Sequence, residues 1–309
     1  MRPICLAAAV GYAILRGVTA LGLSLSQESR TGGAGASAAI FAQVANTSVW
    51  PELRGCIRNV AEAARHHPGL SKLDLHVALT RADAALEDEV RRMRTEIPGL
   101  SDAFASVVQN RGADIGEFMQ QVQYVHQHSS NFSYDLVLKI HSKSSRGNWR
   151  RRMLSTLCGG PGQVRTILGM FGERPRLGLV GPYKLVWTYD TPNEDVFGSL
   201  GDYGFRVGDT ERKMANTWEI IYPGEHSFPP RDRYLISGGS MFWVRPGPLL
   251  SDEFQSAIPK FLSVWDEGYN RSCTTAACDH MFALERVIPT IYYGRYRLDY
   301  AQAPKYQNK

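Results

Sequence analysis

The first half of the chain alternates short apolar runs with longer segments whose apolar residues recur at helical spacing. The apolar runs predict strands at residues 37–45, 73–80, 105–109 and 134–140. The helical spacing predicts helices at residues 50–67, 83–97 and 114–126, with Asp114 as the N-cap of the third. Strands that alternate with helices of this length predict an α/β fold with an open, mostly parallel, Rossmann-like sheet and helices on both faces.

The pattern is less regular in the second half of the chain. Helices are predicted at residues 150–157, 164–171 and 279–287, and strands at 177–183, 234–245 and 290–294. Residues 159–162 (Gly-Gly-Pro-Gly) are predicted to form a turn, and a Gly pair at 238–239 interrupts the strand at 234–245. Residues 186–233 show little periodicity, so we expect a long functional or flexible loop there.

The beginning of the chain differs from the rest. Apolar residues fill positions 4–25, interrupted by Arg16, and a stretch rich in Gly and Ser follows. Three interpretations stay open, namely a signal anchor in a membrane, a cleaved secretory signal peptide and an organelle transit peptide. We expect a leader and linker at 1–36, one folded domain at 37–295 and a C-terminal tail at 296–309.

Composition excludes several classes of protein. With 309 residues, 43% of them hydrophobic and 21% charged, the chain is neither disordered, collagen-like nor a coiled coil. Its five cysteines are too few for a disulfide-framed fold, and none has the close paired spacing of a zinc cage. We therefore expect one large hydrophobic core or two small ones.

The basic charge of the chain is concentrated in one stretch. Residues 139–152 contain six Lys and Arg and no acid, whereas the whole chain has a net charge of only +5. If the strand at 134–140 continues through its end, Lys139, His141 and Lys143 point to the same side, with Arg150 just beyond. Ligands of open parallel sheets bind at the carboxyl ends of the strands, so these residues suit a diphosphate. The alternative is a solvated basic loop that pairs with acids elsewhere.

The second half offers a candidate base and no cofactor motif. Asp279 begins a predicted helix, where it serves either as an N-cap or as a general base, and Arg286 shares its helix face. No P-loop, Gly-x-Ser-x-Gly or Gly-x-Gly-x-x-Gly occurs, and His-Ser-Lys stands at 141–143, where many parallel-sheet transferases have a metal-binding Asp-x-Asp. We therefore expect no cofactor and no metal, with a divalent cation left open.

Together these motifs resemble the rhamnan synthesis protein F family of glycosyltransferases over residues 38 to about 290. The matching pieces in the first half are Ala39-Ile40-Phe41, Trp50-Pro51-Glu52-Leu53, Asp74-Leu75-His76-Val77, Asn110-Arg111-Gly112-Ala113-Asp114-Ile115, Tyr134-Asp135, Lys139-Ile140-His141-Ser142-Lys143-Ser144 and Trp149-Arg150. Those in the second half are Leu177-Gly178-Leu179-Val180-Gly181-Pro182, Gly238-Gly239-Ser240-Met241-Phe242-Trp243-Val244-Arg245, Asp279-His280 and Leu284-Glu285-Arg286. Residues 273–280 depart from the usual Asp-Gly-Thr lead-in of the family.

The resemblance implies a GT-A-like enzyme of polysaccharide or lipopolysaccharide synthesis. It would move a sugar, such as rhamnose, from a nucleotide diphosphate donor to a glycan hydroxyl with inversion. We expect Asp279 and His141 to be catalytic. The donor diphosphate would be bound by Lys139, His141, Lys143 and Arg150. The nucleoside or sugar would be held by Asn110, Gly112 and Asp114. The acceptor pocket would contain Gly239, Ser240, Trp243, Glu285 and Arg286.

The expected partners are a nucleotide-sugar donor, a glycan acceptor and a membrane tether through residues 4–25. This predicts a membrane-associated enzyme, either type II in the Golgi or endoplasmic reticulum lumen of a eukaryote, or cytoplasmic or on the inner-membrane face otherwise. The sequons at Asn46, Asn131 and Asn270 fit a lumenal enzyme. The competing hypotheses are a non-catalytic protein that binds glycan or nucleic acid through residues 139–152, and a degenerate transferase. Nucleic acid is not expected, because few aromatic residues accompany the basic stretch.

Overall fold

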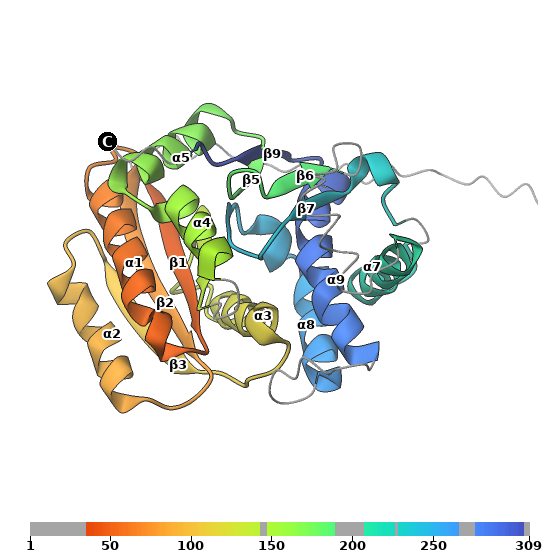
Figure 1. Ribbon diagram of the computed structural model, residues 1–309, viewed down its shortest axis with the longest axis horizontal. Coiled ribbons are helices and arrows are strands. Elements are labelled where there is room, and N and C mark those ends of the chain that lie inside the picture. Colours follow the sequence, from red (N-terminus) through yellow and green to blue (C-terminus); the bar gives the residue numbers. More distant parts are fainter. Residues whose placement is uncertain (1–34, 143–146, 189–206, 226–227, 266–275, 306–309) are drawn as a thin grey trace, which may run out of the picture. The chain divides into compact units, whose positions relative to one another are not determined.

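A seven-stranded sheet with the strand order β3-β2-β1-β4-β8-β5-β9 is the centre of the fold (Figure 1). The computed structural model describes residues 35–142, 147–188, 207–225, 228–265 and 276–305. Eight α-helices and nine strands lie in this described part of the chain. The predicted α/β class with an open, mostly parallel sheet is therefore confirmed.

The first half of the chain forms the four-stranded parallel part of the sheet. Its elements are β1 (Ala36–Val44), η1 (Thr47–Val49), α1 (Trp50–Arg65), β2 (Leu70–Leu79), α2 (Ala84–Glu96), β3 (Asp102–Val107), α3 (Ala113–Gln127) and β4 (Leu136–His141). Strand β1 pairs in parallel with β2 and β4, and β2 pairs in parallel with β3. The side chain of Asp83 caps α2 by accepting a hydrogen bond from the Leu86 amide at 3.0 Å. Strand β3 begins three residues earlier than predicted, because Asp102 pairs with Asp74 at the start of the ladder.

The second half completes the sheet and adds helices to both faces. Its elements are α4 (Gly147–Cys158), α5 (Pro161–Glu173), β5 (Leu177–Gly181), β6 (Val186–Thr188), α7 (Val207–Ile221), η2 (Arg231–Arg233), β7 (Leu235–Ser237), β8 (Phe242–Val244), η3 (Gly247–Leu250), α8 (Asp252–Val264), α9 (Ala276–Thr290), η4 (Ile291–Arg295) and β9 (Asp299–Gln302). Strand β8 runs antiparallel to both of its neighbours, β4 and β5. Strand β9 pairs with β5, so residues 299–302 of the expected tail lie in the sheet.

Two strand predictions in this half were wrong. Residues 290–294 form the end of α9 and the π-helical η4, because Ile288, Ile291 and Tyr292 recur at helical spacing and are all fully buried. The predicted strand at 234–245 is two strands of different sheets, since β7 pairs with β6 whereas β8 pairs with β4 and β5. Gly239 and Ser240, with φ of +82° and +52°, turn the chain between them.

Two helices were missed. Helix α7 and strand β6 lie where we expected a long loop, and α8 was not predicted at all. Its buried residues Phe254, Ala257, Ile258 and Phe261 have the spacing of an amphipathic helix, which Pro259 interrupts in the sequence.

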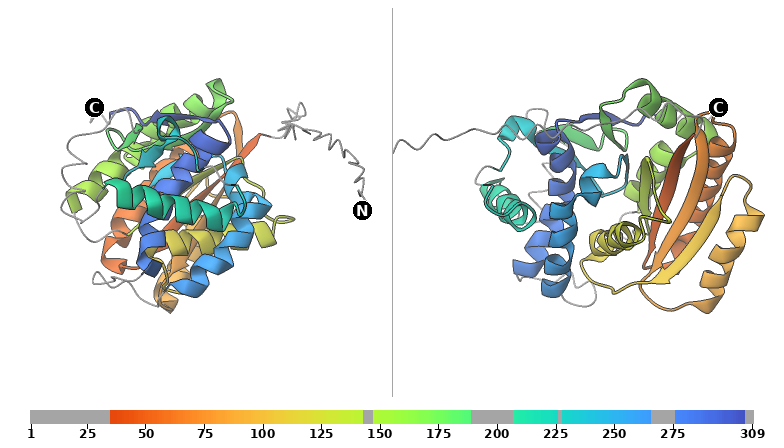
Figure 2. Two further views of the ribbon diagram at one scale, coloured as in Figure 1. Left: turned by 90° about the vertical axis from the view of Figure 1, so that its right-hand side faces the viewer. Right: turned by 180° about the vertical axis from the view of Figure 1, so that it is seen from behind.

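The sheet separates two hydrophobic cores, one on each face. Along β1, Ala38, Ile40 and Ala42 contact the core formed with α1, α2, α4 and α5, whereas Ala39 and Phe41 contact the core formed with α3, α7, α8 and α9. Figure 1 shows α1 and α2 on one side of the sheet and α3 on the other, and Figure 2 shows the same layers from two further directions. The predicted helices on both faces are therefore confirmed.

The expected membrane tether lies outside the described residues. Within the part of the chain that is described, no helix has both the length and the apolar character that a bilayer span requires.

A disulfide bond joins α1 to α4. Cys56 and Cys158 are buried and their Cα atoms lie 5.1 Å apart, and Asn59 Nδ2 also donates a hydrogen bond to the Cys158 carbonyl at 2.9 Å. The cross-link closes a segment of 102 residues, which includes β2, β3 and β4. The spacing of the five cysteines gave no signal for this pairing.

Reduction of this disulfide should lower the free energy of unfolding by about 2 to 4 kcal/mol, because the cross-link restricts the unfolded chain. Guanidinium unfolding of the whole protein with and without dithiothreitol measures the change. The double variant Cys56→Ser/Cys158→Ser is the control, and its midpoint should not respond to the reductant. A reductant effect of equal size in the double variant would contradict the assignment.

Candidate functional site

The carboxyl end of β4 meets the first turn of α3 in a cluster of charged and polar side chains. Lys139 Nζ lies 2.9 Å from Asp114 Oδ2, and His141 Nε2 lies 3.5 Å from the same oxygen. Lys139 and His141 are two residues apart on a strand, so they point to the same side of the sheet. Asp114 stands in the first turn of α3, where the partial positive charge of the helix end favours a carboxylate.

Gly112, rather than Asp114, is the N-cap of α3. It has a left-handed φ of +69°, and a Cβ atom at this position would overlap the ring of Trp265. Gly112 therefore lets α3 begin close to the end of α8. Packing against Trp265 therefore explains why a glycine stands at position 112. Asn110 lies partly exposed in the loop just before Gly112.

The turn between β7 and β8 closes the cluster from the other side. His141 Nε2 donates to the Gly239 carbonyl at 2.9 Å, since a carbonyl oxygen can only accept. Ser240 Oγ donates to Asp114 Oδ2 at 2.5 Å, and the Gly239 amide donates to Glu285 Oε1 of α9 at 2.9 Å. The structure thus brings together residues that the sequence assigned to the donor site and to the acceptor pocket.

Packing and backbone conformation explain the second glycine of the pair at 238–239. A Cβ atom on Gly239 would overlap Met153 and Trp149 of α4, and its φ is positive. Gly239 therefore allows α4 to pack closely against the β7–β8 turn.

Burial dominates the electrostatics of the cluster. The Lys139 side chain has no exposure to water, which lowers the pKa of its ammonium, while Asp114, Glu117 and Glu285 oppose that shift. Glu117 is 2% exposed, and burial together with Asp114 raises the pKa of its carboxyl to about 8. Glu117 is therefore mostly protonated at neutral pH, and the carboxylate in direct contact with the Lys139 ammonium is that of Asp114.

Sequence reasoning missed Glu117. It lies three residues after Asp114, on the same face of α3, and this spacing was the available signal. Its Oε2 atom is buried and has no hydrogen-bond partner among the residues that the structure describes.

Arg150 and Trp243 have partners within the fold. Arg150 donates from Nε and Nη2 to the two carboxylate oxygens of Glu52 at 2.9 and 2.7 Å, which joins α4 to α1 and lowers the pKa of Glu52. Trp243, expected in the acceptor pocket, is fully buried in the core and donates to the Leu157 carbonyl at 3.2 Å. The position of Trp243 on β8 therefore places its ring in the core.

The remaining predicted residues divide into two groups. Glu285 contacts the β7–β8 turn through the Gly239 amide. Arg286 is 8% exposed, and burial lowers the pKa of its guanidinium against the opposing charge of Glu285. Lys143 lies outside the described residues, as does the side chain of Asp279, whose backbone belongs to α9.

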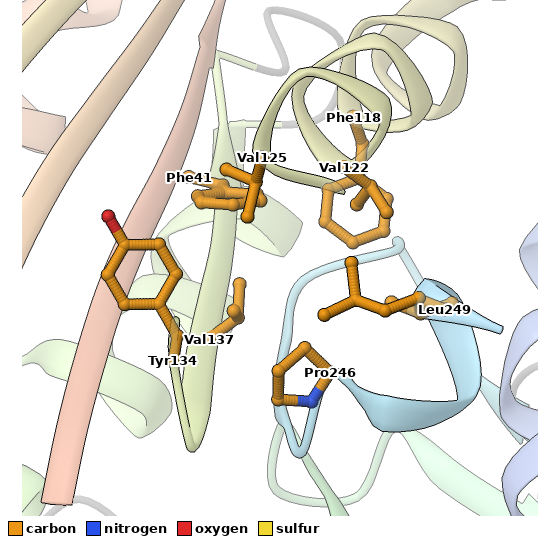
Figure 3. A pocket seen from close by; sticks show the side chains of 9 residues that line it. Phe41, Phe118, Val122, Val125, Tyr134, Val137, Pro246 and Leu249 are labelled. Carbon is orange, nitrogen blue, oxygen red and sulfur yellow. The ribbon is translucent and has the colours of Figure 1, made fainter. Parts of the chain in front are cut away.

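Neither a small cavity in the core nor any group of metal-ligating side chains adds a second site among the described residues. A small apolar cavity of about 10 Å³ lies between β4, α3 and η3, lined by side chains that include Phe118, Val122 and Leu249 (Figure 3). It is too small and too apolar for a ligand and belongs to the core. Among the described residues, no group of three or more His, Cys, Asp or Glu side chains is placed to hold a metal ion.

The ion pair between Lys139 and Asp114 should respond differently to the loss of each partner. Asp114→Asn leaves a fully buried ammonium without its counter-charge and should lower the free energy of unfolding by about 3 kcal/mol. Lys139→Met should cost less, because Asp114 is partly exposed and keeps the hydrogen bond from Ser240. Urea unfolding of both variants and of the double variant tests this, and equal losses in the two single variants would contradict it.

The protonated state of Glu117 should make stability depend on pH. The carboxyl has a pKa of about 8 in the folded protein against an ordinary value of 4.5. Between these two values the folded state holds one more proton than the unfolded state, so the free energy of unfolding should fall as the pH rises from 4.5 to 8. Glu117→Gln should reduce this slope by one proton in unfolding titrations, whereas Glu173→Gln, at the exposed end of α5, should not. An unchanged slope in Glu117→Gln would refute the assignment.

Comparison with known families agrees with the motifs. Residues 69–257, from the start of β2 into α8, match the family of rhamnan synthesis protein F. Comparison with curated proteins gives no match. The matched segment includes β4, the first turn of α3 and the β7–β8 turn, and it covers more than half of the chain. The chain therefore belongs to the rhamnan synthesis protein F family, which gives it a glycosyltransferase-like role in polysaccharide synthesis.

Proposed function

We propose that the protein is an inverting glycosyltransferase that moves a sugar, rhamnose being the first candidate, from a nucleotide diphosphate to a glycan hydroxyl. The observation that carries this proposal is the cluster of Asp114, Lys139, His141 and Ser240 at the carboxyl end of β4. In open α/β sheets this is the edge at which ligands bind. Family membership supports a role in polysaccharide synthesis.

The proposed reaction is a single displacement. The acceptor hydroxyl oxygen forms a bond to the anomeric carbon of the donor sugar from the face opposite the diphosphate. The bond between that carbon and the diphosphate oxygen breaks, and its electron pair leaves with the diphosphate. The hydroxyl proton goes to a carboxylate base, a contribution of order 10²- to 10⁴-fold, and we assign Asp279 of α9 to this role.

Fixed positive groups and N–H donors would stabilise the charge of the departing diphosphate. We propose His141 and Lys143 for this role, because the His141 ring lies at the β7–β8 turn, where its Nε2 contacts the Gly239 carbonyl, and Lys143 follows it by two residues in the chain. Arg150 is bound to Glu52, so we propose that it positions α4 at this edge. In this proposal these groups perform the function that a metal ion has in other transferases.

Asp114 and the β7–β8 turn would hold the sugars. The Asp114 side chain is 23% exposed, and its orientation is fixed by Lys139 and Ser240, so it can accept hydrogen bonds from donor hydroxyls. Asn110 and Gly112 adjoin it and are proposed to contact the nucleoside. Gly239, Ser240, Glu285 and Arg286 are proposed to contact the acceptor sugar.

The proposed setting is a membrane-associated enzyme tethered through residues 4–25. Disulfides persist in oxidising compartments, so the bond between Cys56 and Cys158 supports the lumenal alternative over the cytoplasmic one. Lys139 and Arg150 are engaged with Asp114 and Glu52, which argues against a phosphate-tracking strip for nucleic acid along residues 139–152.

The proposal is tested by transfer assays on the whole protein with a panel of nucleotide sugars and a rhamnan acceptor, with and without EDTA. We expect transfer from one donor, resistance to EDTA and inversion at the anomeric carbon. Asp279→Asn should reduce the turnover number by about 10² to 10⁴, and Lys143→Ala should reduce it strongly without a comparable loss of stability.

Lys260→Ala, an exposed lysine of α8, is the matched control and should keep full activity. Full activity in Lys143→Ala would remove the argument for a positively charged diphosphate site. Loss of transfer in EDTA, restored by a divalent cation, would overturn the metal-free mechanism.

A further inference from the structure

A second hollow lies away from the β4 cluster, between the edge strand β3 and α3. It has a volume of about 780 Å³, and its lining includes Phe104, Ser106, Gln109, Gln123, Tyr124 and Gln127. Strand β3 is the end strand of the sheet, so one of its sides has no neighbouring strand in the described fold. We call this hollow the β3–α3 groove.

One face of α3 supplies a row of amide side chains to the groove. Gln120, Gln123, Tyr124 and Gln127 recur at positions i, i+3, i+4 and i+7, which places them on one face of the helix. The Gln120 side chain is held against the wall of the groove by two hydrogen bonds. Its Nε2 donates to the Gln109 carbonyl at 2.9 Å, and its Oε1 accepts from the backbone N–H of Gln109 at 3.0 Å. Within the described residues, the side-chain amides of Gln123 and Gln127 have no such bond.

Tyr124 forms a fixed aromatic platform within this row. Tyr124 is 46% exposed, and such exposure is unusual for a residue with a large aromatic ring. The ring packs against His128 at a centroid distance of 4.3 Å and against Phe132 at 5.9 Å. The platform is therefore held in place before any ligand arrives.

The groove is close to electrically neutral. Arg91 is its one basic side chain apart from the histidine, and it is paired with Glu87 at 3.1 Å and Asp88 at 2.8 Å. Burial lowers the pKa of His76, which lines the base of the groove, to about 3, so this ring is neutral at physiological pH. A polyanion would find no free positive charge among these lining residues.

This combination of groups matches a neutral carbohydrate. Amide side chains both donate and accept hydrogen bonds, as hydroxyl groups require, and the C–H face of a sugar ring packs on an aromatic ring. The strand order places β2 and β1 between β3 and β4, so the edge strand of the groove lies about 14 Å from β4. A ligand that contacts both β3 and the β4 cluster must therefore be an extended chain.

We propose that the β3–α3 groove binds a neutral stretch of the acceptor polysaccharide, several sugars away from the end that reacts. The proposal rests on the proposed function, since it assigns the groove to the acceptor of the same enzyme. In this proposal the groove favours long acceptor chains over short ones, whereas the β4 cluster holds the reacting sugars.

The test uses the whole protein and two neutral probes, a disaccharide and a hexasaccharide of rhamnose. Calorimetry measures their affinities, and transfer assays measure KM and kcat for each as an acceptor. The variants are Tyr124→Ala and the pair Gln123→Ala/Gln127→Ala, and Val264→Ala, an equally exposed apolar residue of α8, is the control. Thermal unfolding checks that each variant is folded.

We expect the hexasaccharide to bind more tightly than the disaccharide, and Tyr124→Ala to weaken its binding about tenfold. KM for the hexasaccharide should rise by a similar factor, with kcat and all disaccharide values unchanged, and Val264→Ala should behave as the wild type. Hexasaccharide binding that is lost in Tyr124→Ala would support the groove even if no transfer were detected, so a failure of the proposed function is distinguishable.

Equal affinity for both probes, or unchanged hexasaccharide affinity in the folded Tyr124 and Gln123/Gln127 variants, would overturn the proposal even if transfer proceeds. Absence of hexasaccharide binding together with capture of an extended peptide along β3 would also overturn it, because the free edge would then serve strand addition.

Discussion

The arrangement of the site depends on one lysine ammonium that has no access to water. Burying a charge costs several kcal/mol unless an opposite charge and hydrogen bonds compensate it. Lys139 is compensated by Asp114, which in turn accepts a hydrogen bond from Ser240. The need of Lys139 for a counter-charge therefore holds the first turn of α3 against β4. The hydrogen bond from Ser240 to Asp114 holds the β7–β8 turn against the same cluster.

The same requirement separates the residues that hold the site from those that would contact substrate. Lys139 and Glu117 are buried, so their contribution is to set the charge and orientation of Asp114. Asp114 itself is partly exposed, so it can contact a ligand while the buried Lys139 fixes its orientation. Arg150 has a similar indirect position, since its two hydrogen bonds to Glu52 hold α4 beside α1.

The parallel half of the sheet could be predicted because hydrophobic periodicity and local turn signals agree there. Asp83 and the Pro-Gly pairs mark helix ends in the sequence, and the structure places the helices accordingly. Residues 290–294 were misread because Ile and Tyr favour strands in isolation, whereas burial against the second core keeps this segment helical. The strand pattern at 234–245 could not reveal that two residues with positive φ divide it between two sheets.

The candidate site was predictable in part. The alternation of Lys139 and His141 along a strand indicated that both face one side, and the family motifs indicated which other segments accompany them. The pairing of Lys139 with Asp114 and that of Arg150 with Glu52 depend on how helices pack on the sheet, which no spacing rule contains. The burial that shifts Glu117 is likewise a property of the assembled fold.

The antiparallel strand β8 has a consequence for the order in which the molecule can be built. Strands β1 to β4 are complete when residue 141 has been synthesised, but the contacts of His141 with Gly239 and of Asp114 with Ser240 join residues 98 and 126 positions apart. Closing loops of this size is entropically unfavourable until the partner surfaces pack. A growing chain can therefore have its parallel strands in place long before the candidate site is assembled, because that site is complete only when the last third of the sequence places β8 beside β4.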